Sequence, residues 1–160
     1  SGGSGVTRTK RRMTLCTVLL LCNLVFIWGN SLLPAEVSGQ ISGTLKALLD
    51  GVFTPGEAVP SGGDGLLRKC AHFAEFGALG LLLGWLFGML GKKRLPAFAL
   101  GVAAACIDET IQVFVPGRSP GIRDVCIDSC GAAAGMLLLV LGHAYWKRRF
   151  TRKNSGGNET

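Results

Sequence analysis

Ionisable side chains interrupt the apolar stretches between residues 66 and 128. His72 and Glu75 stand three residues apart, a spacing that on a helix suits a general base with its orienting carboxylate, or two ligands of one metal ion. The next two apolar runs carry further polar groups: Asp108, Glu109, Gln112, Asp124 and Asp128. A charge in hydrocarbon costs about 3 kcal/mol on insertion scales. Such a cluster is therefore expected to pair internally, line a polar cavity or do chemistry.

Basic residues accompany these acids, and two of them, Arg118 and Arg123, bracket a Pro/Gly turn. Guanidinium forks suit phosphate or carboxylate groups. The residues predicted to bind a ligand are Arg68, Lys69, Gln112, Arg118, Arg123, Asp124 and Asp128. The residues predicted to be catalytic, if a bond is broken, are His72, Glu75, Asp108 and Glu109.

A structural explanation of the same cluster stays open. Five acids meet four bases, so the group nearly neutralises itself and can act as a salt-bridge lock between helices. The arginines can also extend to lipid headgroups, and Gln112 can hydrogen-bond between helices. No fixed metal-binding signature is present, so neither a metal nor a cofactor is expected. No nucleophile has a convincing partner, which favours a binding protein over an enzyme.

The elements that must position these residues are membrane helices. With 48% hydrophobic residues among 160, and a mean hydropathy of +0.39, the chain has apolar runs too long for a soluble core. We expect an all-α integral membrane bundle of four transmembrane helices, at about 13–33, 66–90, 96–115 and 124–146. They form one domain, 13–146, between a tag remnant with a basic N-terminus (1–12) and a basic tail (147–160).

Charge distribution predicts the orientation. Twelve of the 17 Lys and Arg residues flank the first helix, the turn at 92–94 and the last helix. By the positive-inside rule both termini and this turn are cytoplasmic, and the polar cluster lies at the extracytoplasmic side. These basic groups have no stacking aromatic residues between them, so the net charge of +7 indicates a membrane surface and no nucleic acid.

Two further patterns concern packing. A single apolar stripe at helical spacing predicts a short amphipathic helix on the outer surface, formed by Ile41, Leu45, Leu48, Leu49 and Val52. An ordinary loop helix is the alternative for this segment. Gly80, Gly84 and Gly88 repeat every four residues, and Gly131 and Gly135 share a helical stripe with Asp124 and Asp128. Ridges of small residues let membrane helices approach closely. The acids on that stripe should therefore point into the bundle.

Several motifs occur together at the ends of the predicted helices. They are Asn30-Ser31-Leu32-Leu33-Pro34, Lys69 with His72-Phe73, Asp108-Glu109 with Gln112, Phe114 and Pro116-Gly117-Arg118, and Asp124 with Gly131 and Gly135. In this combination the chain resembles the VanZ-like family of bacterial membrane proteins over roughly residues 20 to 140. It departs from the family at Asp128, where Asn is usual, and at Phe76, where Tyr is common.

The resemblance implies a function at the bacterial cell envelope, because the family is named for a protein linked to teicoplanin resistance. The expected location is the cytoplasmic membrane, with the functional face outside. The expected partners are membrane lipids and either a lipid-linked cell-wall precursor or a glycopeptide antibiotic, whose access the protein alters. The alternative is a small intramembrane hydrolase or transferase acting on such intermediates. A transporter would require a homo-oligomer, since four helices without an internal repeat form no pathway alone.

Overall fold

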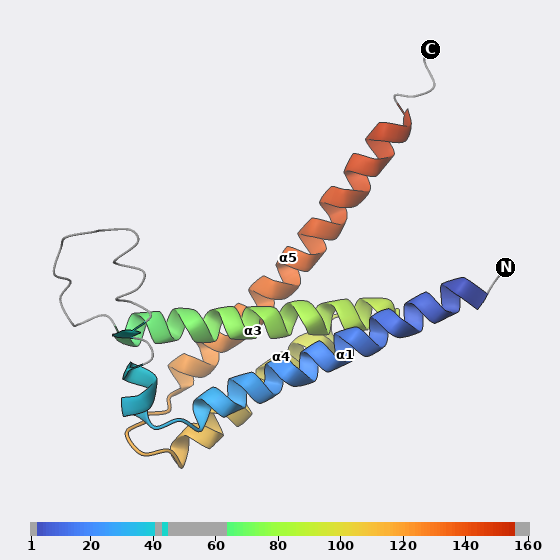
Figure 1. Cartoon of the computed structure of the whole chain (residues 1–160). Coiled ribbons are helices and arrows are strands. Elements are labelled where there is room, and N and C mark those ends of the chain that lie inside the picture. Colours follow the sequence, from blue (N-terminus) through green and yellow to red (C-terminus); the bar gives the residue numbers. More distant parts are fainter. Residues whose placement is uncertain (1–2, 41–42, 45–63, 156–160) are drawn as a thin grey trace.

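The chain folds as a bundle of four long helices, as a computed structural model shows for residues 3–40, 43–44 and 64–155 (Figure 1). The helices are α1 (Gly3–Ser31), α3 (Asp64–Met89), α4 (Leu95–Val113) and α5 (Ile122–Ser155). None of the described residues is in a β-strand. The predicted all-α fold is confirmed.

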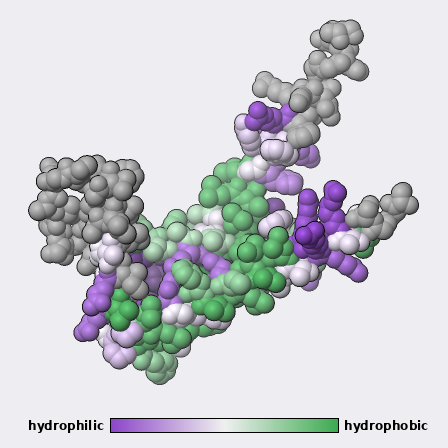
Figure 2. Space-filling view, in the orientation of Figure 1, coloured by the Kyte–Doolittle hydropathy of each residue, from purple (hydrophilic) through white to green (hydrophobic). Residues whose placement is uncertain are grey.

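Each long helix can cross a bilayer. Each contains an 18-residue window that is apolar and holds at most two charged residues, within the segments Gly5–Ser31, Leu66–Met89, Leu95–Val113 and Ile122–Arg149. Large apolar side chains are exposed along them, and Figure 2 shows a hydrophobic middle between hydrophilic ends. Apolar side chains facing outward are the arrangement that lipid requires. The protein is therefore a multi-pass membrane protein.

Two helices are longer than the sequence pattern predicts. α1 begins at Gly3 and α5 continues to Ser155, so both run through the basic flanks. Lys and Arg are strong helix formers, and no proline interrupts either flank. Once the membrane segment is helical, each added residue extends an existing helix without a new nucleation cost.

The two ends of the bundle differ in what they carry. The N-terminal end of α1, the C-terminal end of α5 and the α3–α4 turn lie at one end, and the α4–α5 turn lies at the other (Figure 1). Gly91 makes the α3–α4 turn with a positive φ of 65°, which favours glycine. The end that faces the cytoplasm stays a prediction. The predicted amphipathic stripe between Ile41 and Val52 lies outside the described residues.

Helices α3 and α5 approach closely through small residues. A Cβ at Gly80 would overlap the backbone of Ala132, and one at Gly135 would overlap the backbone of Gly77. Gly84 also faces α5, whereas a Cβ at Gly88 would have nothing within 4 Å. The predicted close contact of α3 with another helix is thus confirmed at Gly80 and Gly84. The third glycine at this contact is Gly77, whereas Gly88 was predicted.

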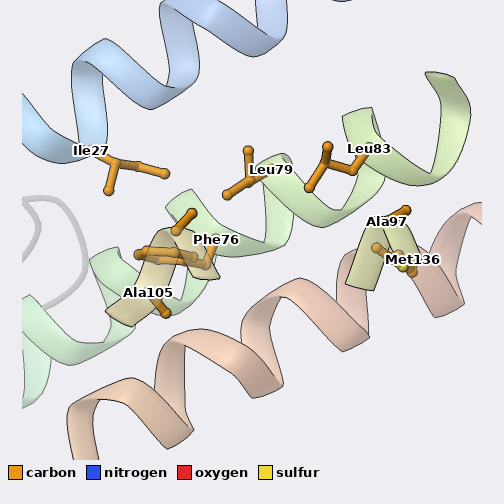
Figure 3. Close-up of a cluster of buried hydrophobic side chains, with 8 residues drawn as sticks. Ile27, Phe76, Leu79, Leu83, Ala97, Ala105 and Met136 are labelled. Carbon is orange, nitrogen blue, oxygen red and sulfur yellow. The ribbon is translucent and has the colours of Figure 1, made fainter. Parts of the chain in front are cut away.

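Apolar side chains from all four helices fill the centre of the bundle (Figure 3). The buried cluster consists of Ile27, Phe76, Leu79, Leu83, Ala97, Ala104, Ala105 and Met136. α1 is also attached by polar contacts to its neighbours: Cys16 Sγ donates to Leu82 O (3.4 Å) in α3, and Trp28 Nε1 donates to Ala104 O (3.5 Å) in α4. The first contact holds the middle of α1, and the second lies near the end of α1 that carries Asn30 and Ser31.

Candidate functional site

A buried hydrogen-bond network surrounds Asp108. Its carboxylate is fully buried and accepts a 2.6 Å bond from Ser31 Oγ, at the last residue of α1. Gln112 Nε2, one helical turn further along α4, donates to Asp108 Oδ2 (2.9 Å) and to Ser31 Oγ (3.3 Å). Two donors on one carboxylate offset part of its desolvation cost. The network therefore joins α1 to α4 and fixes the orientation of Asp108.

His72 of α3 lies between two buried carboxylates. Its Nδ1 is 3.9 Å from Asp108 Oδ2 and 4.0 Å from Asp128 Oδ1, distances too long for hydrogen bonds. Among the described residues this buried Nδ1 has no hydrogen-bond partner. Asp128 is 2% exposed, and in the same part of the chain no group donates a hydrogen bond to it. His72 Nδ1 therefore lacks the partner that a buried nitrogen normally has.

The other two predicted catalytic carboxylates hold segments of the chain together. Asn30 Nδ2 of α1 donates to Glu75 Oε1 (3.1 Å), and the backbone nitrogen of Gly121 donates to Glu109 Oε2 (2.8 Å). The first bond joins α1 to α3, and the second joins α4 to the α4–α5 turn. Glu75 keeps one buried oxygen, Oε2, without a partner in the described segments.

Arg118 acts as a C-terminal cap of α1. Its Nη2 donates to Asn30 O (3.1 Å) and Leu33 O (3.2 Å), and its Nε donates to Leu33 O (3.3 Å). The last carbonyls of a helix lack intrahelical donors and carry partial negative charge, so a guanidinium there is favourable. Burial, helped by the like charge of Arg68, lowers the pKa of Arg118 from its usual value. An arginine nevertheless stays protonated at neutral pH.

Replacing Arg118 with lysine is expected to lower the free energy of unfolding by about 1–2 kcal/mol, because an ammonium cannot reproduce the fork across two carbonyls. Thermal melting of the purified protein in detergent measures the loss. Arg123→Lys is the control, since Arg123 is exposed on the same side of the bundle. Equal melting temperatures for the two variants would show that the cap contributes nothing.

Two cavities meet at His72 and Arg68. The smaller, about 20 Å³, is lined by Arg68, Lys69, His72, Glu109, Gln112, Asp124, Ile127 and Asp128. The larger, about 560 Å³, lies between α1 and α3 and is lined, among the described residues, by Phe26, Asn30, Leu33, Ser38, Leu67, Arg68, Cys70, Ala71, His72, Glu75 and Arg118. One cavity is thus mostly polar, and the other combines apolar and charged walls.

The structure gathers ten of the eleven predicted site residues at one place. Arg123 is the exception: it is exposed and lines neither cavity. Lys69 and Asp124 face each other at 3.8 Å, and each side chain is about one-third exposed. Asn30 and Ser31 complete the site, although the sequence-based prediction did not assign them a role. Their signal was two adjacent polar residues at the end of an apolar helix.

Comparisons with known proteins identify the family. The family model described as VanZ/LLP1 matches residues 9–143, which includes every residue of both cavities. A search of curated proteins and a search of solved structures return no match. The match covers most of the chain and confirms the resemblance seen in the motifs. The chain is a member of the VanZ/LLP1 family of membrane proteins.

Proposed function

We propose that the protein binds the anionic headgroup of an amphiphilic cell-envelope molecule in the larger cavity. The observation that carries this proposal is the combination of walls around that 560 Å³ space. Phe26, Leu33 and Leu67 supply an apolar side, whereas Arg68 and Arg118 supply a cationic one. Cavities of about 300–1,000 Å³ with a few placed polar groups are typical of small-molecule sites.

Arg68 is the cation best suited to a ligand. It lines both cavities, and no hydrogen bond or ion pair engages it within the described residues. Arg118, by contrast, uses Nε and Nη2 on α1 and leaves Nη1 without a partner in the same part of the chain. A cation near a bilayer is costly unless an anion pairs with it. A phosphate between Arg68 and Nη1 of Arg118 would supply that anion.

Among the expected ligands, a lipid-linked cell-wall precursor fits these walls best. It presents a phosphate next to a hydrocarbon chain, which matches a cationic wall next to an apolar one. A glycopeptide such as teicoplanin is the other expected ligand. Either would place the protein at the outer side of the bacterial cytoplasmic membrane, where binding alters access of the drug to its target and so contributes to resistance.

The test is a ligand-induced shift in thermal melting. In mild detergent, undecaprenyl phosphate, a lipid-linked precursor and teicoplanin are each added to the full chain. A ligand at 100 times its dissociation constant stabilises the protein by about 2.7 kcal/mol. Arg68→Gln should abolish the shift at an almost unchanged melting temperature without ligand. Arg123→Gln, which removes an exposed arginine outside both cavities, should retain it.

Two results would contradict the proposal. The first is the absence of a shift with all three ligands. The second is an equal shift in wild type and Arg68→Gln, which would place the ligand away from the cationic wall. If undecaprenyl phosphate and the precursor both act while teicoplanin does not, the protein recognises the lipid phosphate and affects the drug only through its target.

A second candidate is an intramembrane hydrolase or transferase. The observation in its favour is His72, which lines both cavities and faces Asp108 and Asp128 without a hydrogen bond to Nδ1 in the described residues. In that reaction His72 would transfer a proton, with Glu75 or Asp108 assisting, while the arginines hold the anion. Ser31, the hydroxyl that contacts a carboxylate, is fully buried and lines neither cavity. Phosphate release from a lipid-linked precursor distinguishes turnover from binding.

A further inference from the structure

Three side chains from three helices converge at one point of the bundle. His72 Nδ1, one carboxylate oxygen of Asp108 and one of Asp128 all lie within 4.8 Å of one another. A cation between them can therefore stand within about 2.8 Å of each atom, a few tenths of an ångström beyond Ca²⁺–oxygen contacts and about half an ångström or more beyond Zn²⁺–ligand contacts. Small side-chain rotations close such gaps.

Two of the three groups, His72 and Asp128, have no hydrogen-bond partner in the described part of the chain. Asp128 is only 2% exposed, yet no group in the described part of the chain donates a hydrogen bond to it. His72 Nδ1 is buried and likewise without a hydrogen-bond partner there. Two buried carboxylates this close also repel each other when both are charged. The adjoining cavity of about 20 Å³ has room for one water or one ion.

We propose that His72, Asp108 and Asp128 bind a divalent transition-metal ion. Two carboxylates and a neutral imidazole together carry two negative charges, which a divalent cation balances. A mixed set of nitrogen and oxygen ligands suits Mn²⁺ or Zn²⁺, whereas Mg²⁺ and Ca²⁺ prefer oxygen alone. Three protein ligands leave further coordination positions for water or a ligand oxygen.

Neighbouring residues already hold one ligand in place. Ser31 Oγ and Gln112 Nε2 donate to the two oxygens of Asp108, at 2.6 and 2.9 Å. Hydrogen bonds of this kind orient metal ligands, and their loss typically weakens metal binding about 10–100-fold. The proposed ion does not depend on the lipid ligand. It would nevertheless lie beside the cationic wall, because His72 and Arg68 line both cavities.

The experiment uses Mn²⁺ as its probe. The full chain is purified in detergent without a polyhistidine tag, stripped with EDTA and titrated with MnCl₂, while the electron paramagnetic resonance signal of free Mn²⁺ is recorded. We expect one Mn²⁺ to disappear from solution per chain, and an equivalent of Zn²⁺ to displace it, since Zn²⁺ binds such sites more tightly. Electron spin-echo modulation of bound Mn²⁺ should show a histidine nitrogen.

Two matched variants assign the site. Asp128→Asn keeps the side-chain shape and removes a ligand charge, so Mn²⁺ binding should weaken at least tenfold. Glu36→Gln removes an exposed carboxylate that lines neither cavity and is not part of the group, so binding should stay as in wild type. Equal affinity in wild type and Asp128→Asn would overturn the proposal. The absence of Mn²⁺ binding to the wild-type protein would also overturn it, as would bound Mn²⁺ that shows no nitrogen signal. Both of these measurements use the wild-type protein alone, so they do not depend on whether a variant folds.

Failure of this proposal and failure of lipid binding are distinguishable. The metal titration contains no lipid, and the lipid-induced melting shift can be measured in EDTA. If the protein binds no metal but still shows the lipid-induced melting shift, only the proposed metal site is wrong. If the protein binds the metal but shows no lipid-induced melting shift, the metal site is supported and the proposed lipid function is wrong.

Discussion

Gly135→Ala is expected to lower the melting temperature by roughly 2–12 °C, which corresponds to an overpacking cost of about 1–3 kcal/mol in a chain of this size. The added Cβ would overlap the carbonyl group of Gly77 and stand 3.0 Å from the backbone nitrogen of Leu81. A side chain that is overlapped can change rotamer, but a helix backbone cannot move alone. The helices α3 and α5 must therefore separate.

Gly142→Ala is the matched control, because it introduces the same methyl group in the same helix, where a Cβ has nothing within 4 Å. Alanine has the higher helix propensity, so this variant should melt at or slightly above the wild-type temperature. Detergent melts followed by circular dichroism measure both. If the two variants melt alike, the close approach of α3 and α5 at Gly77 and Gly135 is wrong.

This contact shows what a sequence pattern can predict and where it fails. Gly80 and Gly84 identified α3 as a closely packed helix, because four-residue spacing of small residues defines a face. Which part of the face makes contact depends on the crossing angle. In the structure α5 crosses α3 steeply and its C-terminal half leaves the bundle (Figure 1). Gly77 therefore contacts α5, whereas Gly88 does not.

The polar site, too, was predicted from the sequence only in part. The glycine stripe predicted that Asp128 points into the bundle, and the cost of a charge in lipid predicted that the polar residues cluster. Spacing within one helix, however, says nothing about partners in another. The bonds from Asn30 to Glu75 and from Ser31 to Asp108 join residues 45 and 77 positions apart. Arg118 and Arg123 looked equivalent beside the turn, yet only Arg118 reaches the carbonyls at the end of α1.

Asp108→Ala is expected to cost about 2–6 kcal/mol of stability, because it leaves two buried donors unpaired at about 1–3 kcal/mol each. The substitution leaves the Ser31 hydroxyl and the Gln112 amide facing a void where the carboxylate was. Ser31→Ala should cost about 1.5–3 kcal/mol, because it removes one hydrogen bond to a charged group. The double variant should then be less destabilised than the sum, since the two residues share one bond.

Asp108→Asn separates a structural network from a functional site. The amide keeps the volume of the carboxylate and can accept from Ser31, while Gln112 can rotate and present its oxygen, so the protein should melt within about 1 kcal/mol of wild type. A pure helix lock would then lose nothing else. If the same variant binds Mn²⁺ at least tenfold more weakly, Asp108 does more than hold α1 against α4. Wild-type stability in Asp108→Ala would contradict the network itself, because no fully buried carboxylate with two donors can be removed without leaving those donors unpaired.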